Sequence, residues 1–116
     1  MLITKEFTFD SAHFLTNYHG KCEKMHGHTY KMHVTIEGEV KDDGMVYDFV
    51  ELKKLVRKKV IDKLDHALLN DVIKNPSAEN ICIWTWEQLQ DEIEGADLYE
   101  VKVWETATSF ATYRGQ

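Results

Sequence analysis

The stretch that decides the fold covers residues 26–37 and reads HGHTYKMHVTIE. Apolar side chains occupy every second position of its later part: Tyr30, Met32, Val34 and Ile36. A period of two is typical of a β-strand with one buried face. His26 and His28 precede this strand in the same phase, which predicts that they belong to its buried side.

The segments outside this strand show the patterns of three more strands and two helices. Leu2–His13, Leu98–Glu105 and Ser109–Tyr113 have the short apolar patterns of strands. Helical apolar stripes follow Asp48 and Ser77, which are candidate N-caps, and Gly95 is the expected end of the second helix. The order ββααββ predicts an α+β fold, with a four-stranded antiparallel sheet and two helices on one face. The two open edges of such a sheet favour a homo-oligomer.

Length and composition exclude several classes of protein. The chain has 116 residues, which is the size of a single domain spanning residues 1–116. It lacks an apolar run that could cross a membrane and a secretory signal pattern, and two cysteines are too few for a disulfide scaffold. The formal net charge of −6 disfavours a nucleic-acid partner. We therefore expect a cytoplasmic protein that binds neither nucleic acid nor membrane.

Histidines are concentrated in one short part of the chain. Four of the six lie within 16 positions, and His26-Gly27-His28 places two imidazoles on the same side of a strand. His13, on the apolar side of the first strand, is a candidate third ligand. Three imidazoles with an open fourth position are typical of a catalytic zinc site. Two alternatives remain: histidines that bind no metal, and a closed structural site in which Cys22 is the fourth ligand.

Further candidate residues lie near this cluster or at the ends of elements. Cys22 stands between two lysines, which favour its thiolate, so it is either a base or nucleophile or an ordinary loop cysteine. Asp65 and His66 are either a carboxylate–imidazole pair, which would need irregular backbone, or a polar helix end. Glu105 ends an otherwise apolar strand face. It could accept two parallel N–H groups, such as those of a pterin or guanine, or form a salt bridge to a lysine or Arg114.

Several motifs in order resemble those of one enzyme family over essentially the whole chain. They are Phe9-Asp10-Ser11-Ala12-His13, Cys22-x-x-x-His26-Gly27-His28, Asp48-Phe49, Leu64-Asp65-His66, Asn75-Pro76-Ser77-Ala78-Glu79-Asn80, Trp104-Glu105-Thr106 and Tyr113-Arg114-Gly115. Together they resemble the 6-pyruvoyl-tetrahydropterin and 6-carboxy-tetrahydropterin synthases.

This resemblance implies a fold, a cofactor and a set of site residues. The fold is the tunnelling fold, in which subunits join their sheets into a barrel, as a tetramer or hexamer with active sites at subunit interfaces. Zinc is held by residues matching His13, His26 and His28. Cys22 matches the proton-abstracting base, and Asp65 with His66 matches its relay. Glu105 matches the pterin anchor. Ser77 matches a pterin-contacting region, although Ala78 departs from the small hydroxylated residue often found beside it.

The resemblance also implies a substrate, 7,8-dihydroneopterin triphosphate. The three-residue gap between Cys22 and His26 resembles the carboxy type, which forms 6-carboxy-tetrahydropterin and acetaldehyde on the route to queuosine and other 7-deazaguanines. One alternative is a 6-pyruvoyl-tetrahydropterin synthase, which eliminates triphosphate without cleaving the side chain. The alternative from another class is a non-catalytic oligomer that binds a pterin or purine.

Overall fold

A computed structural model describes residues 1–15 and 25–116, and for His26 it describes the backbone only. It contains one five-stranded sheet in the order β3-β1-β2-β4-β5. The strands are β1 (Leu2–His13), β2 (His26–Glu37), β3 (Ala67–Leu68), β4 (Asp97–Thr106) and β5 (Ser109–Tyr113). The helices are α1 (Phe49–Val56), the π turn η1 (Arg57–Ile61), α2 (Asp62–Leu64), the 3₁₀ turn η2 (Leu69–Asp71) and α3 (Ala78–Leu89).

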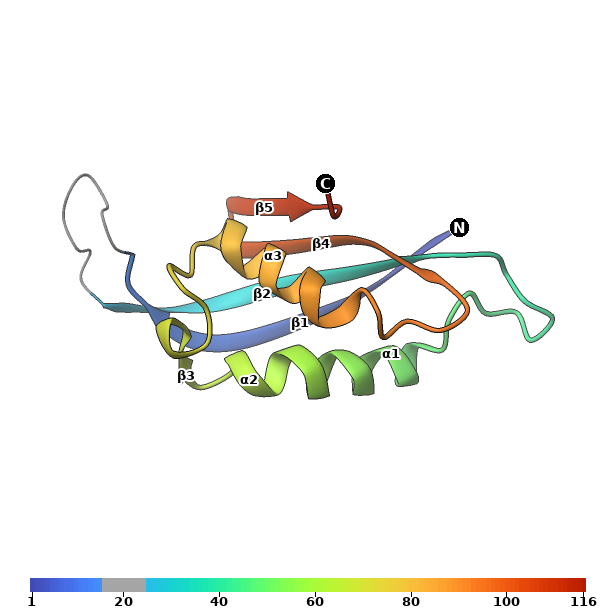
Figure 1. The fold of residues 1–116 in the computed structure, drawn as a ribbon, viewed down its shortest axis with the longest axis horizontal. Helices are drawn as coiled ribbons and strands as arrows, with labels where there is room; N and C mark the ends of the chain where they lie inside the picture. The colour runs from blue at the N-terminus through green and yellow to red at the C-terminus, as the bar shows by residue number, and fades with distance from the viewer. Residues whose placement is uncertain (16–24) are drawn as a thin grey trace.

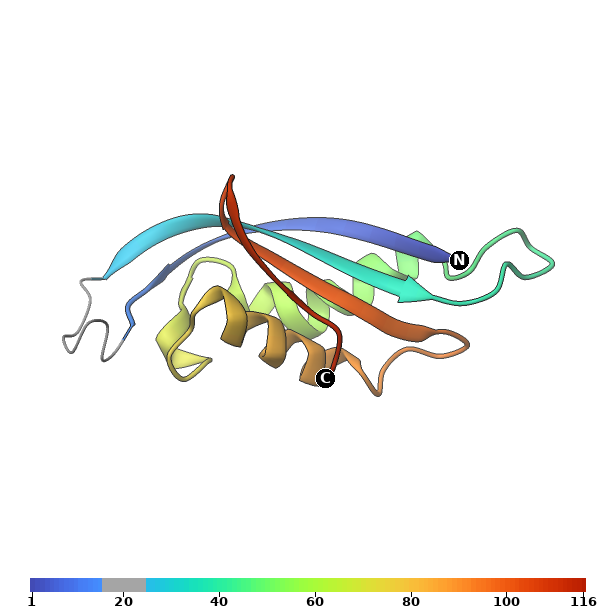
Figure 2. The same ribbon diagram turned by 90° about the horizontal axis from the view of Figure 1, so that it is seen from above.

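The helices cover one face of the sheet and leave the other face uncovered (Figures 1 and 2). The core lies between these layers and is formed by apolar side chains of β1, β2 and β4 against those of α1, η1 and α3. Phe9 and Tyr30, neighbours on β1 and β2, stack with ring centroids 5.0 Å apart. The predicted α+β architecture, with helices on one face, is confirmed.

Residues 49–64 form one helical segment that contains the π turn in its middle. Its fully buried residues recur every fourth position, at Leu52, Val56, Val60 and Leu64. In a regular α-helix a four-residue step overshoots a full turn by about 40°, so this stripe would drift away from the sheet. The wider turn at Arg57–Ile61 absorbs that drift and keeps all four side chains on the core.

The predicted four-stranded antiparallel sheet is wrong in one respect, because a fifth strand runs parallel to β1. Asp65 leaves α2 in an extended conformation, and His66 follows with a φ of 55°. This turn brings Ala67 and Leu68 alongside Ser11 and Ala12. A strand of two residues is too short to show a periodic pattern, so the sequence gives no sign of it.

The helix ends also differ in part from their prediction. Asp48 and Ser77 are confirmed as N-caps, since their side chains accept hydrogen bonds from the amides of Val50 and Asn80. The second helix ends at Leu89, six residues before Gly95. Ile93 packs on the core from the turn that follows, which extends the apolar stripe beyond the helix itself. Among the helices of the described ranges, none is both long and apolar enough to cross a bilayer.

Candidate functional site

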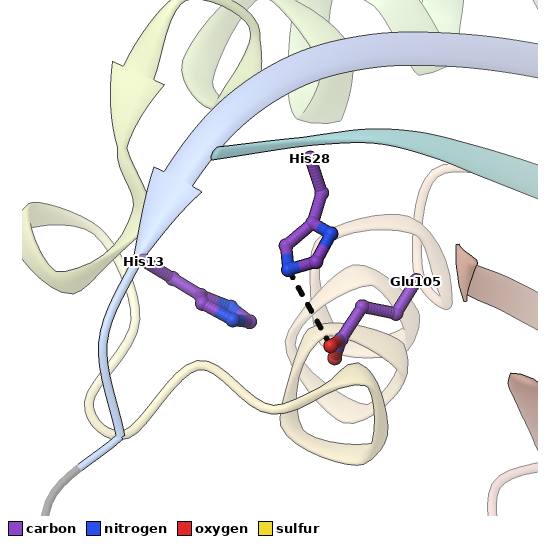
Figure 3. Close-up of side chains that lie close together, drawn as sticks. All are labelled: His13, His28 and Glu105. Atoms are coloured by element: carbon purple, nitrogen blue, oxygen red, sulfur yellow. Dashed lines mark ion pairs between the residues drawn. The ribbon is translucent and has the colours of Figure 1, made fainter. Parts of the chain in front are cut away.

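His13, His28 and Glu105 converge at one end of the sheet, on the side that carries the helices. They come from the ends of β1, β2 and β4, and each can offer a ligand atom within 4.8 Å of the other two (Figure 3). Nε2 of His28 lies 3.5 Å from Oε1 of Glu105, and the rings of His13 and His28 meet edge to face at 5.3 Å. Three strand ends thus bring two imidazoles and one carboxylate to a common point.

His13 is almost fully buried and is held by two oxygen atoms. Its Nδ1 lies 3.0 Å from the carbonyl oxygen of Pro76 and 2.7 Å from the hydroxyl of Tyr30. A carbonyl oxygen can only accept, so we assign the ring proton to Nδ1. That tautomer places the lone pair on Nε2. A backbone carbonyl that orients a histidine in this way is a common partner of metal-ligating imidazoles.

Glu105 owes its direction to a β-bulge. Trp104 pairs with Phe110 and Thr106 pairs with Ser109, so Glu105 is the extra residue between two pairs of the β4–β5 hairpin. A bulge re-aims the side chain of its extra residue, and here the carboxylate points toward His28. Of the two predicted salt bridges, the one with Arg114 is wrong, because Arg114 pairs with Glu100 at 2.9 Å. Among the residues that the structure describes, the ion-pair partner of Glu105 is His28.

The three side chains are chemically suited to a metal ion. Two imidazole nitrogens and a carboxylate oxygen are ordinary zinc ligands, and the Nδ1–Pro76 contact gives His13 the required tautomer. The backbone of His26 lies directly opposite His13 in the β1–β2 ladder. The side chain of His26 is outside the described part of the structure, so its role as a ligand remains a prediction.

Asp65 and His66 form a second group beside β1. Nδ1 of His66 lies 3.0 Å from Oδ1 of Asp65, and that oxygen also accepts the amide of Asp10. The irregular backbone that such a pair needs is present, because Asp65 is extended and His66 has a positive φ. The backbone amide of His66 donates to the carbonyl oxygen of Asp10. The pair is therefore bonded to both backbone groups of this one residue of β1.

The Asp65 carboxylate is electrostatically stabilised. The hydrogen bond from the Asp10 amide, followed by that from His66, holds the pKa of Asp65 below its usual value, although partial burial opposes the shift. Asp65 is therefore ionised at neutral pH. An ionised carboxylate at Nδ1 fixes the proton there and leaves Nε2 of His66 as the basic atom.

The metal candidate and the Asp65–His66 pair are two separate groups beside β1. His13 and Ser11 face the helix layer and are buried, whereas Asp10 is exposed and its carboxylate accepts the Thr29 hydroxyl at 2.6 Å. A depression of about 500 Å³ is lined by Asp10, Thr29 and His66, and His28 of the metal candidate also borders it. The metal candidate therefore lies on the helix side of β1, whereas Asp65 and His66 bond the backbone of Asp10 at the edge of that strand.

A separate cavity of about 470 Å³ adjoins Glu105. It lies between the N-terminus of α3 and the β4–β5 hairpin, and its lining includes Ala78, Glu79, Glu105 and Thr106. Ser77 caps α3 through its oxygen, while its hydroxyl hydrogen can still be donated. Its predicted contact with substrate remains a prediction.

The remaining histidines and cysteines of the chain are His19, His33, Cys22 and Cys82. Cys22 and His19 lie outside the described residues, so the predicted base stays a prediction. His33, on the uncovered face, pairs with Glu6 at 2.8 Å. Cys82 is buried in the core, and its burial raises the pKa of the thiol to about 12.

Four supporting residues were missed by the sequence interpretation. Pro76 and Tyr30 hold His13, Asp10 holds the Asp65–His66 pair, and the amide of Asn70 bonds both backbone groups of Phe14 next to His13. Tyr30 stands in phase with His28, which was an available signal. Pro76, Asp10 and Asn70 act through contacts with backbone groups or across long sequence separations, and no local sequence pattern predicts such contacts.

Comparison with known proteins gives a consistent result. The sequence model of the family described as 6-pyruvoyl tetrahydropterin synthase matches residues 2–116. The chain is 39% identical to a 6-pyruvoyl tetrahydrobiopterin synthase of Dictyostelium discoideum, over 100% of this chain and 97% of that protein. It is 35% identical to a 6-carboxy-5,6,7,8-tetrahydropterin synthase of Haemophilus influenzae, over 97% of each protein.

A solved structure shows the same likeness in three dimensions. The 6-pyruvoyl tetrahydropterin synthase of Caenorhabditis elegans superimposes with a TM-score of 0.87 at 30% identity, over 100% of this chain and 96% of that one. With its strand-end histidines, its bulged glutamate and a match along nearly its whole length, this chain belongs to the 6-pyruvoyl tetrahydropterin synthase family.

Proposed function

We propose that this protein is a zinc-dependent 6-carboxy-tetrahydropterin synthase. It would convert 7,8-dihydroneopterin triphosphate to 6-carboxy-tetrahydropterin, acetaldehyde and triphosphate, on the route to queuosine-type bases. The observation that carries the proposal is the convergence of His13, His28 and Glu105 at one end of the sheet in a chain of this family.

The proposed site assigns a task to each side chain. His13, His28 and His26 hold zinc, which when bound supplies a Lewis acid for the side-chain oxygens of the substrate. Glu105 accepts N–H groups of the pterin ring, which enters the cavity beside it, and Ser77 contacts the substrate. Cys22 removes a proton from the side chain of the substrate.

The Asp65–His66 pair completes this site from a neighbouring subunit. Within one chain it forms a group separate from the metal candidate, at the edge of β1 and beside the depression lined by Asp10 and Thr29. A homo-oligomer, a tetramer or hexamer joined through the sheet edges, would bring the pair of one copy to the cysteine of the next. His66 then exchanges the proton with Cys22, and Asp65 keeps its imidazole oriented.

A product assay separates the carboxy reaction from the pyruvoyl one. Zinc-loaded protein is incubated with dihydroneopterin triphosphate, and both aldehyde and pterin are followed. We expect acetaldehyde in equal amounts with 6-carboxy-tetrahydropterin. Triphosphate release without acetaldehyde would instead identify a 6-pyruvoyl-tetrahydropterin synthase, the second candidate, whose name relatives of this chain also carry.

The Cys22→Ala variant tests the role of the cysteine. We expect it to keep its zinc and lose turnover by at least about a hundredfold, as removal of an essential base does. Loss of zinc from this variant would point to a closed structural site. Pterin binding without turnover in the unmodified protein, unaffected by a chelator, would support the non-catalytic alternative.

A further inference from the structure

We propose that Asn70 is a positioning residue of the metal candidate, because its side chain holds the end of β1 from which His13 projects. The inference rests on the proposed function, in which His13 binds zinc, and it adds a residue that acts through the backbone beside that ligand. Asn70 reaches β1 across 56 positions of sequence.

The pairing between β1 and β3 ends before β1 itself does. β3 accompanies β1 only as far as Ala12, which pairs with Leu68, and the chain turns away at Leu69, where η2 begins. His13 therefore lies beyond the last pair on this edge of β1. On the other edge it pairs with the backbone of His26 in β2. A strand edge that loses its partner leaves backbone groups that need other hydrogen bonds.

The side chain of Asn70 takes the place of the strand that is missing there. Its Oδ1 accepts the backbone amide of Phe14 at 3.0 Å, and its Nδ2 donates to the carbonyl oxygen of Phe14 at 2.9 Å. A carboxamide carries an acceptor and a donor side by side, as a peptide group does, so it can satisfy both backbone groups of one strand residue. The β3 edge of β1 is thereby held at both neighbours of His13, Ala12 and Phe14.

Asn70 and the partners of the His13 ring act on different parts of that residue. Pro76 and Tyr30 contact Nδ1 and so determine the rotation and the tautomer of the ring. Asn70 fixes the backbone next to His13 and so determines where the ring starts. Because a zinc–nitrogen bond is only about 2.0–2.1 Å long, a small displacement of the strand end weakens it even when the ring keeps its tautomer.

The first test measures the zinc affinity of the whole protein by competition with a chromophoric chelator. Asn70→Ala removes both hydrogen bonds and makes room for water, which can bond the exposed backbone groups but does not tie β1 to η2. We expect zinc binding to weaken about tenfold, the lower end of what loss of a supporting partner costs. Thermal unfolding verifies that the variant folds, and Asn70→Ser provides the same test if the alanine variant does not.

Thr4→Val is the matched control. It removes a part-buried side-chain hydrogen bond, the 2.8 Å contact with the Thr35 hydroxyl, from the other end of the same strand. We expect its zinc affinity to change by less than about twofold, as for independent sites. Equal losses of affinity in the Asn70 and Thr4 variants, or no loss in the Asn70 variant, would overturn the proposal.

The second test uses Co²⁺ in place of zinc, because its visible absorption depends on the arrangement of its ligands. At saturating Co²⁺, we expect the bands of Asn70→Ala to differ from those of the unmodified protein in wavelength or intensity. The bands of Thr4→Val should superimpose on those of the unmodified protein. A general loss of stability would not change the spectrum of the saturated protein, so identical spectra in all three proteins would overturn the positioning role.

Turnover of dihydroneopterin triphosphate is scored separately, so the two proposals can fail independently. An active enzyme whose zinc affinity does not depend on Asn70 would keep the proposed function and lose the positioning role. A protein that binds zinc in a manner dependent on Asn70 but does not convert this substrate would keep the positioning role and lose the proposed function.

Discussion

Tyr30 is fully buried, yet its hydroxyl lies 2.7 Å from Nδ1 of His13. The ring belongs to the core, where it stacks on Phe9, while the hydroxyl reaches the metal candidate. One side chain thereby joins the packing of the sheet to the orientation of a ligand. Tyr30 therefore contributes both to the stability of the fold and to the orientation of a proposed metal ligand.

The Tyr30→Phe variant separates these two effects. It removes only the hydroxyl, so we expect the free energy of unfolding to fall by about 1 kcal/mol, the usual net worth of a buried hydrogen bond. Zinc affinity should fall by up to about tenfold, since His13 loses one of its two orienting partners. Urea denaturation of the metal-free protein and chelator competition measure the two quantities.

Tyr113→Phe is the control for this prediction. The Tyr113 hydroxyl bonds the carbonyl of Gln116 in an exposed position, far in sequence from the histidines. We expect a stability change below about 0.5 kcal/mol, as for most exposed sites, and no change in zinc affinity. A loss of zinc affinity in this variant, or none in Tyr30→Phe, would contradict the proposed role of Tyr30.

At the scale of elements, the residues that follow β5 pack against α3. Gly115 has a φ of 80°, and a Cβ there would lie 2.4 Å from the Trp86 ring. Trp86 also meets Tyr113 of β5 edge to face, at 5.7 Å. Because α3 and the β4–β5 hairpin border the cavity beside Glu105, this contact supports its walls.

We expect Gly115→Ala to lower the free energy of unfolding by roughly 2–4 kcal/mol, by combining a left-handed backbone cost with a forced shift of Trp86. Gly44→Ala isolates the first part, since Gly44 has a φ of 84° and nothing within 4 Å of an added Cβ. That control should lose only about 1–2 kcal/mol. Urea denaturation compares them, and equal losses would show that the Trp86 contact is unimportant.

Element boundaries show what sequence can predict here. β1 and β5 follow their alternation from end to end, and the caps at Asp48 and Ser77 were predicted because capping is a local interaction. β3 has only two residues, and the direction of Glu105 depends on a bulge. Both arise from pairing between distant segments, which no local pattern encodes.

The candidate site was predictable to the same extent. Alternation placed His13 and His28 on the buried side, and this is confirmed. Adjacency in the sequence drew attention to the Asp65–His66 pair, but its attachment to Asp10 crosses 55 positions of sequence. The contact of Pro76 with His13 crosses 63. Such contacts exist only once the chain has folded.

At the scale of the whole molecule, the separation of the metal candidate from the Asp65–His66 pair within one chain predicts composite active sites. Cys22→Ala and His66→Ala should each be inactive alone. When the two variants are unfolded, mixed in equal amounts and refolded together, they should regain about a quarter of the normal turnover. In a randomly assembled oligomer, about a quarter of the sites receive both an intact Cys22 from one chain and an intact His66 from its neighbour.

Refolding each variant separately before mixing, without exchange of subunits, is the control and should leave turnover absent. Size-exclusion chromatography of the samples verifies that assembly is normal. Recovery in neither mixture, with oligomers of normal size, would place the Asp65–His66 pair and the cysteine in the same chain.

The chain contains only two sulfhydryl groups, and the fold shields one of them. Cys82 is enclosed between α3 and the sheet, and a thiol with a pKa of about 12 stays protonated near neutrality. Alkylating reagents attack thiolates, so they will spare this position in the native protein. A thiol-directed tag that the folded chain acquires at neutral pH therefore reports on Cys22, which provides a single thiol handle without removal of the other cysteine.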